Sequence, residues 1–140
     1  MMPLLGREKV TKMTEDAYLR VNDNVRGVYL SGLTNIVQAT PADTGRARNN
    51  WFLSLGVPAS DTTTSKAQGL AAIRQLSQMP KLVLNKKIFY TNNLPYIGVL
   101  EYGGFPIPGG DLTSGGFSKQ APDGWVRKTL IQMQNKIRSL

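Results

Sequence analysis

The sequence predicts an α+β domain in which a small antiparallel sheet packs against long N-terminal and C-terminal helices. Apolar residues recur at helical spacing over residues 14–39, two short segments alternate like strands, and residues 122–139 form an amphipathic helical pattern. A chain of 140 residues suits one core rather than two. We therefore expect a flexible arm over residues 1–13 and a single domain over residues 14–140.

The first helix is expected to begin at Thr14, which is suited to an N-cap because two acids follow it in the first turn. It should end near Ala39, since Thr40 precedes Pro41 and that position disfavours helix. The segment TPADTGRARNNW then predicts a turn and a short helical turn from Arg46 to Arg48.

The middle of the chain predicts two strands, a weak helix and a short helix. Residues 51–57 (WFLSLGV) and 87–92 (KIFYTN) alternate like strands, and residues 66–79 have weaker helical spacing. Pro95 fits the first turn of a short helix that ends at Tyr102. A long loop rich in glycine and proline follows over residues 105–120, and loops of that length are usually functional or disordered.

The composition argues against most kinds of catalytic site and metal site. The chain contains neither cysteine nor histidine, so it has no thiolate nucleophile, no disulfide and none of the commonest metal ligand. No apolar run approaches the ~18 residues that a membrane span needs. The acids outside the N-terminal helix are single residues without ligand spacing, so we expect no metal and no cofactor; they are Asp43, Asp61, Glu101, Asp111 and Asp123.

Glu101 is the one acid that stands in an apolar and aromatic run, YIGVLEYGG. Burial there would raise its pKa and make it a candidate general base. Catalysis of that kind usually needs a second acid. The nearest acid before Glu101 is Asp61, forty residues earlier. The alternative, which we favour, is a structural ion pair with Arg46 or Arg48.

The net charge of +8 favours contact with nucleic acid or with an acidic protein surface, and it also serves simple solubility. Lys86 and Lys87 stand beside Phe89 and Tyr90, as basic and aromatic residues do in some nucleic-acid sites. Because side chains alternate between the two faces of a strand, we expect one of the two rings, Phe89 or Tyr90, to lie in the core. Aromatic residues near the long loop are either interface or core residues: Tyr96, Tyr102, Phe105, Phe117 and Trp125.

Three segments in fixed order, TPADTGRARNNW, TNNLPYIGVLEYGG and SKQAPDGWVRKTL, together resemble the neck or tail-completion proteins of tailed bacteriophages and prophages. The resemblance covers about residues 14–138. The positions that carry it or that we expect at interfaces are Asp43, Thr44, Gly45, Asn92, Asn93, Leu94, Pro95, Tyr96, Glu101, Tyr102, Gly103, Phe105, Ile107, Phe117, Gln120, Ala121, Pro122 and Gly124.

The resemblance implies a structural role without catalysis, in the virion at the head–tail junction, after synthesis in the host cytoplasm. It implies a ring of six copies, or twelve if the ring follows the portal, between a connector or head-completion protein and a tail-terminator or tail-tube protein, with DNA passing through. The long loop would then be a docking element. The alternatives are a minor tail or tail-terminator component, a basic DNA-binding protein that acts alone, and a carboxylate enzyme that uses Glu101.

Overall fold

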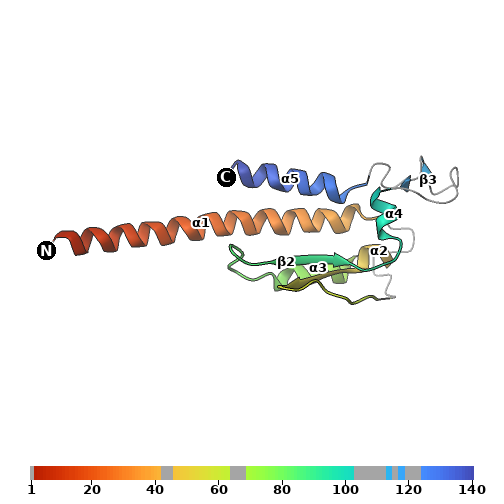
Figure 1. Ribbon diagram of the computed structural model, residues 1–140, viewed down its shortest axis with the longest axis horizontal. Coiled ribbons are helices and arrows are strands. Elements are labelled where there is room, and N and C mark those ends of the chain that lie inside the picture. Colours follow the sequence, from red (N-terminus) through yellow and green to blue (C-terminus); the bar gives the residue numbers. More distant parts are fainter. Residues whose placement is uncertain (1, 42–45, 64–68, 103–112, 115–116, 119–123) are drawn as a thin grey trace.

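The computed structural model describes residues 2–41, 46–63, 69–102, 113–114, 117–118 and 124–140. It confirms an α+β fold with a two-stranded antiparallel sheet and long helices near both ends (Figure 1). The expected Gly/Pro-rich loop lies almost wholly outside the described residues. In chain order the elements are α1 (Met2–Ala39), α2 (Arg46–Asn49), β1 (Trp51–Leu55), α3 (Leu70–Gln75), the 3-10 helix η1 (Leu76–Gln78), β2 (Ile88–Asn92), α4 (Ile97–Tyr102), β3 (Thr113–Ser114), β4 (Phe117–Ser118) and α5 (Val126–Arg138).

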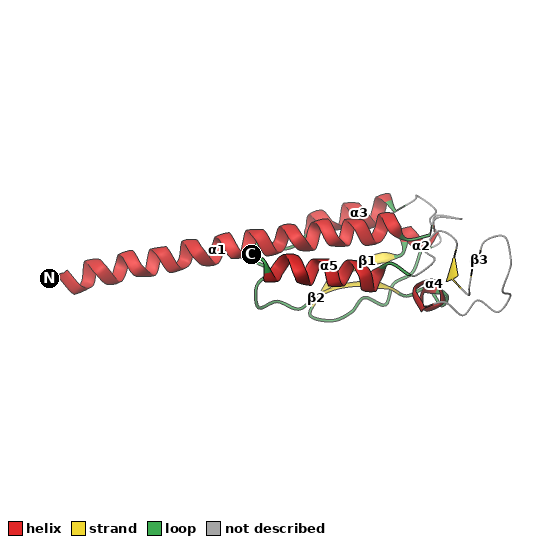
Figure 2. Ribbon diagram, turned by 90° about the horizontal axis from the view of Figure 1, so that it is seen from above, coloured by secondary structure: helices red, strands yellow, loops and turns green. Residues whose placement is uncertain are grey.

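Helix α1 is the axis of the molecule, and α5 and the sheet both lie along its C-terminal half (Figure 1, Figure 2). It ends at Ala39, as predicted, but it begins at Met2 and not at Thr14. The loose arm expected over residues 1–13 is therefore wrong for residues 2–13. Thr14 is not an N-cap, because its hydroxyl donates to the Val10 carbonyl oxygen one turn back (2.9 Å), a bond that a threonine inside a helix can make.

Helix α5 packs closely on α1 because a glycine faces it. A Cβ atom at Gly32 would overlap the Met133 side chain, so the absence of a side chain lets α5 approach. The Asn35 side-chain amide donates to the Thr129 hydroxyl (3.0 Å) and fixes the two helices along their length. The predicted α5 seam is only partly correct: Met133 is buried, whereas Leu130 is half-exposed.

Strands β1 and β2 pair antiparallel, with Leu53 opposite Tyr90. The Trp51 and Tyr90 rings stack with their centroids 5.5 Å apart, which places both on the face that meets α1. Strand β1 ends two residues earlier than predicted, because Gly56 has a φ of 78° and turns the chain out of the strand. The predicted alternation therefore holds only as far as Leu55.

The region between the strands is less helical than predicted. The helix expected over residues 66–79 is α3 followed by the single turn η1, and residues 64–68 lie outside the described part of the chain. Its buried side chains are Ala72, Leu76 and Met79, whereas Leu70 is exposed. The short strands β3 and β4 pair with each other within the segment that was expected to be a loop.

Asn22 fastens the segment that leads into β2 to the middle of α1. Its side chain is fully buried, its amide donates to the Lys81 carbonyl oxygen (2.6 Å), and its carbonyl oxygen accepts from the backbone N–H groups of Val83 (2.7 Å) and Leu84 (3.3 Å). One asparagine thus satisfies three backbone groups that no strand or helix partners.

We predict that Asn22→Ala lowers the free energy of unfolding by about 1–3 kcal/mol, because it leaves those buried backbone groups without partners. Urea unfolding followed by circular dichroism measures the change. Asn24→Ala is the matched control, since Asn24 is exposed on the same helix and carries the same change in helix propensity. Equal stability of the two variants would show that the Asn22 hydrogen bonds contribute nothing.

Candidate functional site

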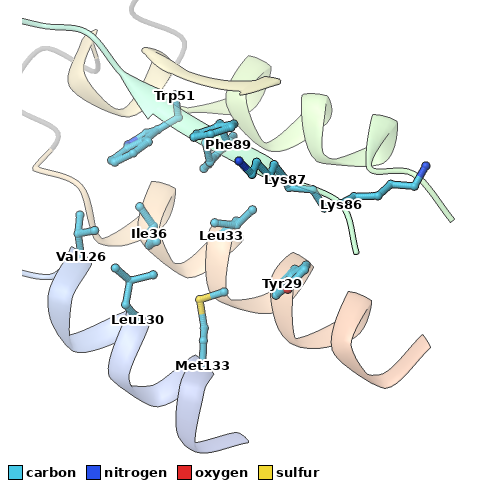
Figure 3. Close-up of a pocket in the computed structure, with 12 residues that line it drawn as sticks. Tyr29, Leu33, Ile36, Trp51, Lys86, Lys87, Phe89, Val126, Leu130 and Met133 are labelled. Atoms are coloured by element: carbon cyan, nitrogen blue, oxygen red, sulfur yellow. The ribbon is translucent and has the colours of Figure 1, made fainter. Parts of the chain in front are cut away.

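An apolar groove of about 490 Å³ opens between α1, β2 and α5 (Figure 3). Tyr29, Leu33 and Ile36 of α1 form its floor, as these side chains point from the helix toward the space between the other two elements. Its walls come from the sheet, which contributes the Trp51 ring and the three residues at the start of β2, and from α5, which contributes Val126, Leu130 and Met133. The three elements diverge enough that the described residues leave this space unfilled.

The groove can bind an apolar group but has little with which to react. No acid stands among the described residues that line it, and its Tyr90 hydroxyl donates to the Ala72 carbonyl oxygen (2.8 Å). Burial raises the pKa of Tyr90, so this phenol stays protonated. Lys86 and Lys87 supply positive charge at the edge: the Lys87 ammonium lies beside Phe89, and Lys86 extends outward along the rim (Figure 3). The site is therefore apolar with a basic rim.

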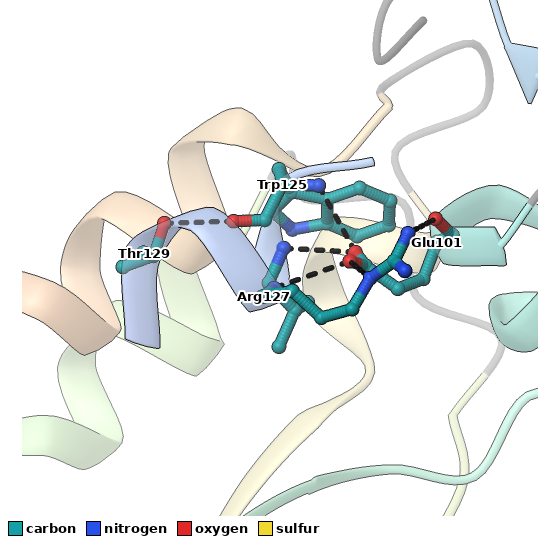
Figure 4. Close-up of polar contacts among 5 residues, drawn as sticks. Glu101, Trp125, Arg127 and Thr129 are labelled. Carbon is teal, nitrogen blue, oxygen red and sulfur yellow. Dashed lines mark hydrogen bonds and ion pairs between the residues drawn. The ribbon is translucent and has the colours of Figure 1, made fainter. Parts of the chain in front are cut away.

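Glu101 lies at a different place, under the first turn of α5 (Figure 4). Its Oε2 atom accepts hydrogen bonds from the backbone N–H groups of Trp125 (3.0 Å) and Val126 (2.8 Å). Its Oε1 atom accepts from the Arg127 backbone N–H (3.1 Å) and from the Arg127 side-chain Nε (3.0 Å). Trp125 occupies the N-cap position and has no capping side chain, so Glu101 of α4 caps α5 from a distance.

These contacts correct the ion pair expected for Glu101. Its partner is Arg127 and not Arg48, whose Nε atom donates instead to the Thr40 carbonyl oxygen (2.7 Å). The Arg46 side chain lies outside the described residues. Arg127 also donates to the Glu101 backbone carbonyl oxygen (3.0 Å), and its guanidinium lies 4.6 Å from the centre of the exposed Tyr102 ring.

The electrostatics of Glu101 favour the structural role over the catalytic one. Burial by itself raises the pKa of Glu101, but the hydrogen bonds from Trp125, Val126 and Arg127 outweigh it and hold the pKa below its ordinary value of 4.5. The carboxylate is only 6% exposed, and both of its oxygens are occupied. A general base needs a pKa nearer neutrality and a free lone pair, so the premise of the carboxylate-enzyme alternative fails at this residue.

Three further motif residues, Asn92, Asn93 and Leu94, fix the chain between β2 and α4. The Asn92 amide donates to the Ala47 carbonyl oxygen (2.9 Å), and the Asn93 amide donates to the carbonyl oxygens of Ala59 (2.8 Å) and Asp61 (3.0 Å). Leu94 is buried. The Asn-Asn pair therefore ends β2 by fastening it to α2 and to the polar loop.

Other expected interface residues divide into exposed positions and undescribed ones. Pro95, Tyr96 and Tyr102 are exposed, and α4 begins at Ile97 rather than at Pro95. Phe117 stands in β4 opposite Ser114. The remaining expected positions lie outside the described residues: Asp43, Thr44, Gly45, Gly103, Phe105, Ile107, Gln120, Ala121 and Pro122.

The N-terminal half of α1 is the second surface with no partner in this structure. Every residue from 6 to 21 is exposed, and the helix extends past the end of α5 and past the sheet (Figure 1, Figure 2). Nineteen residues of helix, 2–20, measure about 28 Å at ~1.5 Å per residue. The large apolar side chains exposed on this half are Val10, Met13, Tyr18, Leu19 and Val21.

Sequence reasoning missed both the groove and the distant cap of α5. A groove depends on how three elements diverge, and spacing along one element carries no signal for that. The cap had a signal: α5 begins after Gly124-Trp125 without Ser, Thr, Asp or Asn at its N-cap, so its N–H groups had to find an acceptor elsewhere.

We predict that Glu101→Gln lowers the free energy of unfolding by about 2–4 kcal/mol at pH 7, since the neutral amide cannot accept all four hydrogen bonds. A carboxylate with a lowered folded pKa stabilises the fold above its unfolded pKa, near 4.5, and this stabilisation is lost as the pH falls through the folded value. The difference between wild type and variant should therefore shrink below about pH 4.5 in urea unfolding. Glu15→Gln, on the exposed half of α1, is the control; a gap that stays constant down to pH 3 would refute the charge-based explanation.

No helix in the described ranges combines the length and the apolar character that crossing a bilayer requires. Across the same ranges, no three acids come close enough together to hold a metal ion. The chain matches no protein-family model, no curated protein and no solved structure.

Proposed function

We propose that this chain is a structural virion protein that forms a ring at the head–tail junction of a tailed bacteriophage. In this role it joins the connector to the tail and leaves a channel for DNA. The observation that carries the proposal is geometric: a small domain presents an open apolar groove and, beside it, a long helix whose N-terminal half is exposed on every side. Both are surfaces of a subunit that is completed by neighbours.

The exposed half of α1 supports a role in assembly because a helix of this length gains little by standing alone. Most helical stability in proteins comes from packing an apolar face. Residues 6–21 have no such packing, although they carry five large apolar side chains. Contact of one face of this helix half with a neighbouring subunit would supply it.

The motif resemblance indicates which assembly this subunit would join. Its partners would be copies of itself, six or twelve, with a connector or head-completion protein on one side and a tail-terminator or tail-tube protein on the other. We assign it no catalysis, because the carboxylate of Glu101 is fully engaged in capping α5. The position of a tail terminator is the alternative within the same assembly.

A second candidate function, DNA binding by a single subunit, has one observation in its favour. Lys86 and Lys87 place two exposed cations next to Phe89 on the rim of the groove. Phe89 and Tyr90 are half-buried, and the Tyr90 hydroxyl is bonded within the fold, so neither ring is a free stacking platform. Strong binding of free DNA by monomers, falling steeply with salt, would favour this function over a neck role.

We predict that the isolated chain is monomeric or weakly associated at micromolar concentration, because a ring subunit should assemble on its platform. Light scattering with size-exclusion chromatography measures the mass. A tight, closed dimer would contradict the proposal, since a two-fold interface uses the same patch on both copies and does not build a six-fold ring.

We predict that a phage lacking this protein accumulates filled heads and separate tails, and that supplying the chain from a plasmid restores joined particles. Electron microscopy of lysates and the titre of infectious particles measure both effects. The plasmid carrying Asn24→Ala is the control for expression of a folded variant, since Asn24 is exposed and outside the groove. Joined, infectious particles without the protein would refute the neck function.

A further inference from the structure

The face of α1 that carries Tyr18 and Leu19 is chemically distinct from the rest of the exposed half. A shallow hollow lies there, lined by Thr14, Glu15, Tyr18 and Leu19. Three acids surround Leu19 at helical spacings of three and four residues, namely Glu15, Asp16 and Asp23. All three are exposed, and the ion pair found within the described part of the chain, Glu101 with Arg127, involves none of them.

The groove between α1, β2 and α5 has the opposite character. It is apolar inside, it has no acid in its lining, and its charged residues are Lys86 and Lys87 at the rim. An apolar side chain flanked by carboxylates fits such a site, because the apolar part fills the space while the acids face the lysines. The chain therefore carries two complementary surfaces.

The two surfaces of one copy cannot meet each other. Leu19 and the groove residues Tyr29, Leu33 and Ile36 belong to the same unbroken helix, α1. Since a helix holds its residues at fixed separations along its axis, the Leu19 face stays outside its own groove (Figure 1). Only a second molecule can bring them together.

We propose that the Tyr18–Leu19 face of α1 docks in the groove of a second copy, with Glu15, Asp16 and Asp23 facing Lys86 and Lys87 of that copy. The inference rests on the proposed function, since it names the contact between neighbouring copies. The two patches are different surfaces, so the contact is heterologous: each copy offers its helix to one neighbour and its groove to the other. Such contacts build rings when the rotation closes.

This contact is weak by itself. A single helix face docked in one groove is a small contact, whereas stable complexes bury ~1,200 Å² of total surface or more. The charges are exposed, so salt weakens their attraction; at 0.1 M ionic strength, charges more than about 10 Å apart are largely screened. A subunit that is monomeric at micromolar concentration and pairs at several hundred micromolar is the expected behaviour.

Disulfide trapping tests the geometry directly, because the chain has no native cysteine. Leu19→Cys is combined with Leu130→Cys, a half-exposed residue of the groove, and the protein is oxidised at several hundred micromolar. The matched control is Val10→Cys with Leu130→Cys. Val10 is 62% exposed against 46% for Leu19, and it lies about two and a half turns away on the opposite side of α1.

The expected result is an intermolecular cross-link, seen by non-reducing electrophoresis, that forms roughly tenfold faster or more when the cysteine replaces Leu19 than when it replaces Val10. Added salt should slow the cross-linking of the Leu19→Cys protein, since it weakens the flanking charge pairs. Equal rates from the two proteins, a faster rate from the Val10→Cys protein, or no cross-link from either would overturn the proposed docking.

Charge reversal gives an independent test that does not depend on cysteine. Lys86→Glu with Lys87→Glu should weaken self-association, measured by sedimentation equilibrium, by roughly tenfold, and Glu15→Lys with Asp23→Lys should do the same. An equimolar mixture of the two variants should recover association, since each groove then meets a helix of opposite charge. Circular dichroism verifies that each variant is folded. Unchanged association in both variants, or no recovery in the mixture, would overturn the proposal.

The phage experiment separates this inference from the function on which it rests. Leu19→Asp places a fourth acid in the apolar contact, and it should reduce the infectious titre in the complementation assay while Val10→Asp leaves it near wild type. If the protein is required but Leu19→Asp complements fully, the docking is wrong and the neck function stands. If phage without the protein are infectious, the neck function itself fails.

Discussion

The carboxylate of Glu101 at the N-terminus of α5 is the interaction on which the rest of the C-terminal architecture depends. An α-helix leaves its first N–H groups without internal acceptors. The N-cap residue of α5, Trp125, has no side chain that can accept hydrogen bonds from them. Glu101 supplies acceptors for three consecutive N–H groups and places negative charge where the helix dipole favours it. Gly124 makes this approach possible, because a Cβ atom there would meet the Glu101 carboxylate at 2.8 Å and its backbone at closer range. The position of α5, and so one wall of the groove, follows from this contact.

A second set of hydrogen bonds fixes the same end of the groove to α1. The Trp125 indole donates to the Ile36 carbonyl oxygen (3.0 Å), which also accepts from the Thr40 hydroxyl (2.6 Å). The Thr40 hydroxyl in turn accepts from the Trp51 indole (3.0 Å) at the start of β1. The two tryptophans thus attach both walls, α5 and the sheet, to the C-terminal end of α1. Away from this end nothing comparable joins α5 to β2 among the described residues, which explains why the groove lies open there.

The sequence was sufficient for features that depend on local spacing and insufficient for those that depend on distant partners. Apolar periodicity located α5, most of α1, and strands β1 and β2. The expectation of a loose arm was wrong because Thr14 offered a capping signal that the helix does not use. The choice of Arg48 as the Glu101 partner was wrong because it followed the proximity of the motifs, whereas the N–H groups at the uncapped start of α5 needed an acceptor. The groove could not be predicted from the spacing of residues along the sequence, since its volume depends on how three elements lie relative to one another.

A weak contact between copies is physically suited to a ring that must form at one time and place. When subunits already stand on a platform, each helix meets its neighbouring groove at a high effective concentration, so a contact that is negligible in solution becomes populated without any new interaction. Closure adds one further contact without a further loss of translational freedom, which makes the complete ring more stable than any open arc. A strong contact would instead assemble subunits free in the cytoplasm. In the proposed ring, the exposure of residues 6–21 would keep this surface available until the platform is present.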